Sequence, residues 1–131
     1  MGTWSHGNFD NDAALDWLID ITTQLLDEIS EAMDAPQSLQ ADALDADLVP
    51  CKIELLCTMA ESGMAPIWPS AQTLLDWKSV YLKAWDDSID ALQPDALYQR
   101  DRRATLVETF DRMIDLARSD QEQESEFENE E

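Results

Sequence analysis

The chain has 131 residues, a formal net charge of -21 and 44% hydrophobic residues, which include five tryptophans. This length and apolar content predict one folded core without metal or disulfide support, despite the charge. The acidity argues against direct binding of nucleic acid, and no apolar run predicts a membrane span or a secretory signal. We therefore expect a soluble, cytoplasmic protein whose partners include no nucleic acid and no membrane.

Only three glycines occur, so the turn residues that β-hairpins need are nearly absent and an all-α fold is expected. The predicted architecture is a compact irregular bundle of about four helices, formed by residues 1–118 as a single helical domain. Residues 119–131 hold seven acidic side chains and no basic one, which predicts a disordered acidic tail.

The first helix is predicted to follow an ordered N-terminal arm, residues 1–9, whose aromatic rings pack onto the domain. Asp10 is the expected N-cap, and Phe9 before it can contact Ala14 as a hydrophobic staple. Apolar residues then recur at three- and four-residue spacing until Pro36 ends the helix. The predicted buried positions are Leu15, Leu18, Thr22, Leu25, Ile29 and Ala32 or Met33.

The second helix is expected after a loop over residues 35–46 that holds one helical turn. It begins near Asp47, carries Pro50 in its first turn, where a missing N–H costs little, and stops at Gly63. Residues 64–69 read as a rigid connection because they contain two prolines.

The third helix, capped by Ser70, is expected to run to about Leu92 and to form the centre of the core. Its apolar face is rich in large aromatic side chains, and we favour a core role over a ligand platform. A fourth helix follows from Asp95 or Asp101 to Arg118. The predicted core positions of these two helices are Leu74, Trp77, Tyr81, Trp85, Ile89, Leu92, Leu106, Val107, Phe110, Met113, Ile114 and Ala117.

Catalytic and metal-binding side chains are sparse. His6 is the only histidine, so neither a carboxylate-bridged di-metal bundle nor a usual zinc site can be assembled. A cluster of Ser5, His6 and Asp10 is local in sequence and has no identified oxyanion donors. Cys51 and Cys57 lie six residues apart, too far around one helix to form a disulfide, and are expected to be buried thiols.

The run Asp10, Asn11 and Asp12 resembles the start of a calcium loop, but the following residues do not fit the EF-hand pattern. We therefore expect no enzyme and no cofactor. The alternative is a magnesium-assisted hydrolase that uses the carboxylates of Asp10, Asp12 and Asp16.

Charge is unevenly distributed along the chain, because the first 51 residues contain no Lys or Arg. The first helix therefore carries an acidic face that is a candidate interaction surface. Three interpretations remain open: a solvated face, internal pairing with Arg100, Arg102 and Arg103, or a binding surface for a basic protein. The residues of this face are Asp12, Asp16, Asp20, Asp27 and Glu31.

The opening residues Gly2-Thr3-Trp4-Ser5-His6-Gly7-Asn8-Phe9-Asp10-Asn11-Asp12-Ala13-Ala14-Leu15-Asp16-Trp17 resemble a small bacterial family of domains of unknown function. The resemblance implies a compact helical bacterial protein and brings no activity with it. We interpret the signature as structural, with caps and an aromatic cluster over the first turn, in preference to a ligand site around Asp10, Asn11 and Asp12. The structural positions are Trp4, Phe9, Asp10, Asn11 and Trp17.

Together these features predict a non-catalytic interaction protein that uses an acidic surface, of which an inhibitor or immunity-type protein for a basic partner is one form. Besides the magnesium hydrolase, the remaining alternative is an acidic domain whose charge serves only solubility or salt adaptation. The oligomeric state stays open.

Overall fold

The computed structural model describes the backbone of residues 2–129 and the side chains of residues 2–124. It confirms the all-α bundle: the described residues hold four α-helices, two short 3-10 helices and no strand. The elements are α1 (Asp12–Met33), η1 (Pro36–Leu39), α2 (Leu44–Glu61), α3 (Ala71–Ser88), η2 (Ile89–Leu92) and α4 (Ala96–Asn129). No helix in the described part is long and apolar enough to cross a membrane.

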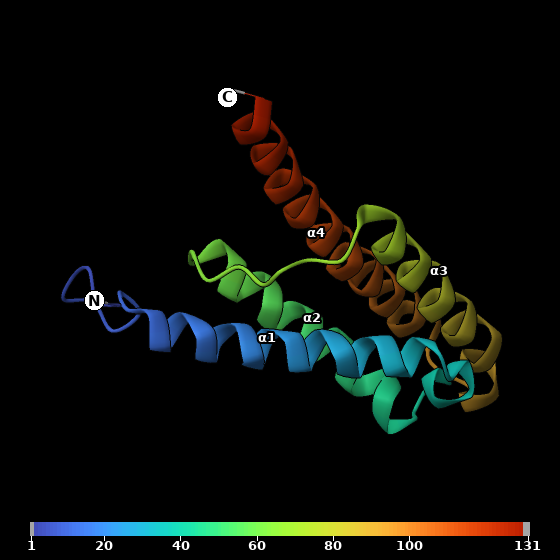
Figure 1. The fold of residues 1–131 in the computed structure, drawn as a ribbon. Helices are drawn as coiled ribbons and strands as arrows, with labels where there is room; N and C mark the ends of the chain where they lie inside the picture. The colour runs from blue at the N-terminus through green and yellow to red at the C-terminus, as the bar shows by residue number, and fades with distance from the viewer. Residues whose placement is uncertain (1, 130–131) are drawn as a thin grey trace.

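The helices form two antiparallel pairs, α1 with α2 and α3 with α4 (Figure 1). Helix α2 also packs against α4 and so joins the pairs. The first part of α1 and the last part of α4 extend away from the place where the pairs meet (Figure 1). Each of these extensions therefore has fewer neighbours than the rest of its helix.

The core contains the large side chains that the periodicity predicted. Tyr81 of α3 and Phe110 of α4 pack in a tilted arrangement at a ring-centroid distance of 5.3 Å, and both are buried. Trp77 and Trp85 are buried as well, which confirms the aromatic stripe as core, whereas Leu92 at its end is exposed. In α1 the core begins at Leu18, not at Leu15 as expected.

Pro50 lies inside α2 and not in its first turn, because the helix begins at Leu44 and not near Asp47. Proline lacks the N–H that would bond the carbonyl four residues earlier, which is that of Ala46. The Tyr81 hydroxyl donates a hydrogen bond to this carbonyl oxygen. A side chain of α3 thus replaces the donor that α2 lacks, and burial raises the pKa of Tyr81 to about 12.

Other predicted boundaries agree closely with the structure. Ser70 caps α3 as predicted, its hydroxyl accepting a hydrogen bond from the backbone N–H of Thr73 at 3.2 Å. The helical turn expected within residues 35–46 is η1. The cap of α1 is Asn11, not Asp10, because the Asn11 side-chain oxygen accepts from the backbone N–H of Ala14 at 2.8 Å.

The expected start of the disordered tail at residue 119 is wrong, because α4 continues through it. Two side chains beyond Arg118 bind the connection before α3. The Trp68 indole N–H donates to Asp120 at 3.1 Å, and the Gln121 amide donates to the Pro69 carbonyl at 2.9 Å. Residues 130 and 131, and the side chains from residue 125, are parts of the expected tail that lie outside the described residues.

Candidate functional site

The N-terminal arm is a closed loop that is held by its own hydrogen bonds. The Trp4 N–H donates to the Asp10 carbonyl at 3.1 Å, and the Asp12 N–H donates to the Gly2 carbonyl at 2.6 Å. The Asp10 carboxylate accepts from the Gly7 N–H at 3.0 Å. A Cβ at Gly7 would overlap this carboxylate, so a larger residue there would displace the Asp10 side chain from its hydrogen bond. This part of the signature is therefore structural.

The aromatic rings of the signature do not pack as predicted. Trp4 is 55% exposed and Trp17 is 58% exposed, so they form no closed cluster over the first turn, and Phe9 is also exposed. The arm lies beyond the free end of α1 and not against the domain (Figure 1). The loop thus holds two aromatic rings in solvent next to a helix that exposes a third.

The first turns of α1 also expose aliphatic side chains. Leu15 and Ile19 are exposed, although Leu15 has the spacing of a core residue. We call the exposed group on the arm and the first turns of α1 the arm–helix surface. It consists of Trp4, Phe9, Leu15, Trp17 and Ile19 together with the acidic side chains Asp12, Asp16 and Asp20.

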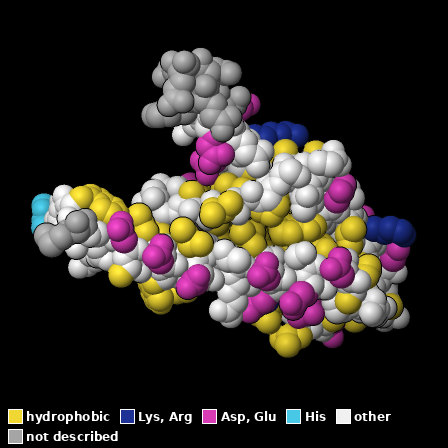
Figure 2. Space-filling view, viewed as in Figure 1, with side chains coloured by type: hydrophobic (Ala, Val, Ile, Leu, Met, Phe, Trp, Pro, Cys, Tyr) yellow, Lys and Arg dark blue, Asp and Glu magenta, His cyan; other side chains and the backbone are white. Residues whose placement is uncertain are grey.

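The acidic row on α1 lies on the side opposite the buried residues, as predicted. Asp12, Asp16, Asp20, Asp27 and Glu31 are all exposed, and none forms an ion pair with a side chain among residues 2–124. In the space-filling view, acidic side chains follow α1 with hydrophobic ones beside them (Figure 2). The row therefore combines uncompensated charge with apolar surface.

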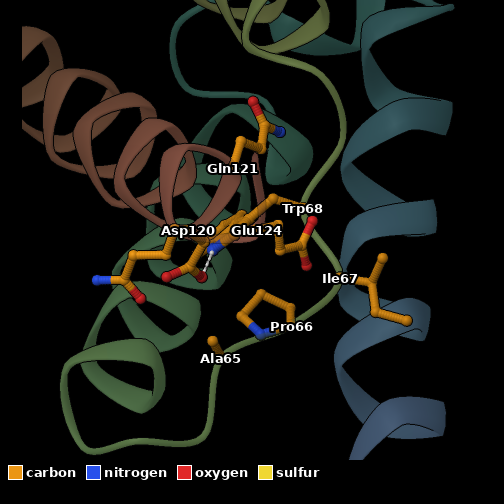
Figure 3. Close-up of a pocket in the computed structure, with 8 residues that line it drawn as sticks. Ala65, Pro66, Ile67, Trp68, Asp120, Gln121 and Glu124 are labelled. Atoms are coloured by element: carbon orange, nitrogen blue, oxygen red, sulfur yellow. Dashed lines mark hydrogen bonds between the residues drawn. The ribbon is translucent and has the colours of Figure 1, made fainter. Parts of the chain in front are cut away.

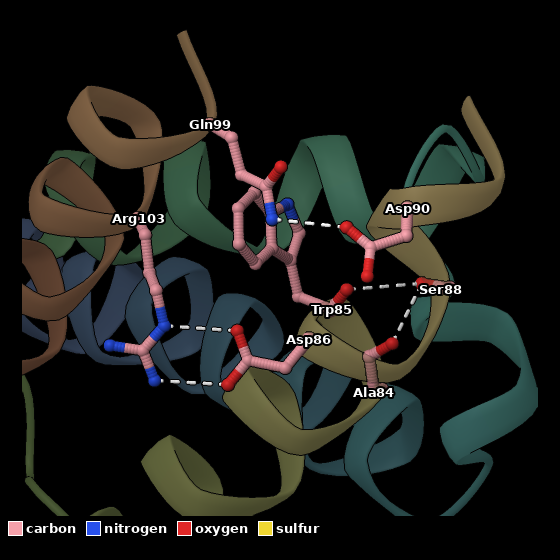
Figure 4. Close-up of polar contacts among 7 residues, drawn as sticks. All are labelled: Ala84, Trp85, Asp86, Ser88, Asp90, Gln99 and Arg103. Carbon is pink, nitrogen blue, oxygen red and sulfur yellow. Dashed lines mark hydrogen bonds and ion pairs between the residues drawn. The ribbon is translucent and has the colours of Figure 1, made fainter. Parts of the chain in front are cut away.

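The proposed internal pairing with the arginines of α4 is wrong, because among the described residues none of these arginines contacts the acidic face of α1 and two of them pair elsewhere. Arg103 binds Asp86 of α3 through two hydrogen bonds of 2.9 Å (Figure 4). Arg100 contacts its neighbour Asp101, and Arg102 makes no ion pair with any described side chain.

Only one carboxylate of α1 is neutralised in the described part of the chain. Lys52 of α2 lies 3.0 Å from Glu28, and this hydrogen bond holds the pKa of Glu28 below its ordinary value near 4.5. Glu28 lies beside the buried half of α1, outside the predicted acidic row. The chain thus pairs the acid next to its core and leaves the outward row unpaired.

Catalytic clusters are not assembled from the predicted residues. The Ser5 hydroxyl lies 3.4 Å from the adjacent His6 ring, but both are exposed, and the Asp10 carboxylate binds the Gly7 N–H instead. Among the described residues, no three His, Cys, Asp or Glu side chains are placed to hold a metal ion. This geometry gives the magnesium alternative with Asp10, Asp12 and Asp16 no support.

The two cysteines differ in their environments. Cys57 is buried, and burial raises the pKa of its thiol to about 11, which makes it a poor nucleophile. Cys51 is exposed, contrary to the expectation of two buried thiols.

A hollow lies between the connection before α3 and the C-terminal part of α4. It has a volume of about 460 Å³ and is lined by Pro66, Ile67 and Trp68 on one side and by Asp120 and Glu124 on the other (Figure 3). The sequence does not indicate this site, because the acidic composition of residues 119–131 predicts a disordered tail that includes Asp120. Residues 120–124 carry no apolar residue, so the sequence has no helical periodicity there that would have indicated this site.

Comparisons with known proteins identify a family and no activity. No curated protein and no solved structure matches the chain. One family model matches residues 2–125, and its description is a domain of unknown function, DUF4259. The match includes the arm, all of α1 and the part of α4 that contacts Trp68. Because the match covers nearly the whole chain, the protein belongs to the DUF4259 family.

Proposed function

We propose that the protein is a non-catalytic interaction protein that binds a basic protein partner through the arm–helix surface. The observation that carries the proposal is the exposure of Trp4 and Trp17 on the same arm and first turns of α1 that carry Asp12, Asp16 and Asp20, none of which has an ion-pair partner among the described residues. Large exposed aromatic side chains in one place typically mark a protein interface.

The two kinds of side chain on this surface have separate roles in binding. The tryptophans supply apolar area that a partner can bury, and tryptophan is enriched among the residues that dominate binding energy. The carboxylates attract a basic partner over long range and raise its association rate. Most of the basic side chains of the chain already have partners, so the acidic row is available to bind another protein.

An inhibitor or immunity-type role in the cytoplasm fits this surface. A protein that binds nucleic acid carries a basic groove, and a row of carboxylates can occupy such a groove in place of phosphates. The partner expected from this chemistry is a protein with a positively charged groove and an apolar pocket at its edge.

The test is affinity capture from a lysate with the intact chain and with a variant that carries Asp12→Asn, Asp16→Asn and Asp20→Asn. The control variant removes the same number of charges from exposed positions of α4, with Glu108→Gln, Asp115→Asn and Glu122→Gln. A basic protein that the intact chain and the control retain at low salt, and that the α1 variant and high salt release, supports the proposal.

Trp17→Ala separates the apolar contribution from the charge. We expect it to weaken binding to the captured protein by at least about tenfold, as truncation of an interface tryptophan commonly does. The proposal is wrong if the α1 variant and its control retain the same proteins to the same extent.

A further inference from the structure

A small pocket beside η2 has features that neither the core nor the arm–helix surface explains. It has a volume of about 160 Å³ and lies where the turn before α2, the end of α3 and the start of α4 meet. The side chains that matter for its chemistry are Asp42, Asp47, Tyr81, Trp85, Tyr98 and Arg102. The pocket therefore brings both signs of charge together with aromatic rings.

Arg102 is unusual among the basic residues of the chain. Six of the eight Lys and Arg side chains form ion pairs with described carboxylates. Of the other two, Arg118 is exposed to solvent, whereas Arg102 is half-buried in the wall of the pocket. A guanidinium that is partly removed from water and has no carboxylate partner is suited to bind an anionic group.

The pocket also carries carboxylates, at Asp42 and Asp47, and neither forms an ion pair with a described side chain. Asp42 has a φ of 78°, a left-handed conformation in which glycine costs least. The only other non-glycine residue with positive φ in the described chain is Gln93, which lies between two residues that line the pocket, Leu92 and Pro94. Strained backbone thus borders the pocket on two sides.

The walls of the pocket are held in place by contacts between elements. The Ser88 hydroxyl accepts from the Ala41 N–H at 2.8 Å and fixes the turn that carries Asp42. The Gln99 amide donates to Asp90 of η2 at 3.3 Å, and Arg103 binds Asp86 of α3, so the first turns of α4 are fixed to both elements (Figure 4). The pocket is therefore preorganised.

We propose that this pocket binds a small zwitterion of the α-amino-acid type. Arg102 takes the carboxylate of the ligand, Asp42 and Asp47 take its ammonium group, and Trp85 and Tyr98 contact its side chain. A ligand with negative charge alone is repelled by the carboxylates, and one with positive charge alone by Arg102. A cavity of about 150 Å³ can hold a benzene-sized molecule, so the volume suits an amino acid with a short side chain.

The experiment uses the full chain and a panel of short L-α-amino acids, which includes valine, threonine and proline, with binding measured by calorimetry and by NMR. Isobutylamine and isovalerate are matched probes, because they are valine without its carboxylate and valine without its amine. We expect at least one amino acid to bind with a Kd of about 1 mM or tighter and to shift the indole N–H signal of Trp85. The two single-charge probes are expected to bind at least about tenfold more weakly than valine.

Variants test which charged side chains of the pocket bind the ligand. Arg102→Gln and Asp47→Asn are each expected to weaken binding about tenfold or more, whereas Arg118→Gln on the same helix leaves it unchanged. Asp42→Gly is expected to weaken binding while it maintains or raises thermal stability, because glycine suits the left-handed conformation, so lost binding is not confused with unfolding.

The proposal is overturned if no amino acid at about 10 mM binds, if isovalerate or isobutylamine binds as tightly as valine, or if Arg118→Gln has the effect of Arg102→Gln. The pocket is independent of the proposed function. The α1 variant with three Asn substitutions is expected to bind amino acids as the intact chain does, so failure of one proposal is distinguishable from failure of the other.

Discussion

The Pro50 turn of α2 and the first turns of α1 both leave groups that their own helix does not satisfy. At Pro50 the unsatisfied group is the Ala46 carbonyl, and the Tyr81 hydroxyl from α3 binds it in the core. On α1 the unsatisfied groups are a row of carboxylates and the side chain of Trp17, and no described residue pairs with the row or buries the indole. The fold completes one region and leaves the other open, which is why we place the partner at the second.

The largest expected effect is the difference in stability loss between substitutions in the buried half and in the exposed half of α1. Ile29 is fully buried, so Ile29→Ala should lower the free energy of unfolding by about 2–5 kcal/mol. Trp17→Ala removes a larger side chain from the same helix, yet it should change stability by less than about 0.5 kcal/mol, because the residue is 58% exposed. Urea denaturation of both variants measures this. A large loss for Trp17→Ala would mean that the arm–helix surface supports the fold.

A smaller loss of stability is expected when the hydrogen bond at the Pro50 turn of α2 is removed. Tyr81→Phe leaves the Ala46 carbonyl without its donor and should cost about 1–3 kcal/mol of unfolding free energy. Pro50→Ala restores a backbone N–H that can bond the same carbonyl, so Tyr81→Phe should cost less in the Pro50→Ala background. A double-mutant cycle by chemical denaturation gives the difference. Equal costs in the two backgrounds would show that the hydroxyl does not replace the missing donor.

The smallest expected effect is a gain in stability when one carboxylate is removed from the first turns of α1. Asp16 has like-charged neighbours one turn away on both sides, Asp12 and Asp20, and each such pair costs about 0.2–0.5 kcal/mol. Asp16→Asn should therefore raise stability by about 0.4–1 kcal/mol at low salt, and the gain should disappear in about 1 M NaCl. Thermal melts at the two salt concentrations provide the measurement. A destabilised variant would mean that Asp16 has a favourable partner within the chain.

Most of the fold could be predicted because local signals agree with packing. The spacing of Trp77, Tyr81 and Trp85 identified the core face of α3, and Ser70 identified its start. The cap of α1 was misplaced by one residue, because Asp10 and Asn11 are both good caps and only the geometry of the loop selects between them.

The remaining errors involve contacts between distant parts of the chain. Leu15 has the periodicity of a buried residue, but periodicity does not tell whether another helix reaches far enough to cover it. Pro50 was predicted in the first turn of its helix because the group that replaces its missing N–H donor, the Tyr81 hydroxyl, lies 31 residues further along the chain. The candidate sites depend on such contacts and on exposure, so composition located the acidic row but neither the arm–helix surface nor the pocket around Arg102.

The contacts of Trp68 and Pro69 with α4 make the chain sensitive to proteolysis at a distance. Arg118 is exposed on α4 just before these contacts, so it is a site that a trypsin-like protease recognises. A cut there removes Asp120 and Gln121, which bind the indole and the carbonyl of the connection before α3. Trimming of the acidic end would therefore remove two hydrogen bonds from a segment in the middle of the chain, and a change in tryptophan fluorescence would report the cut.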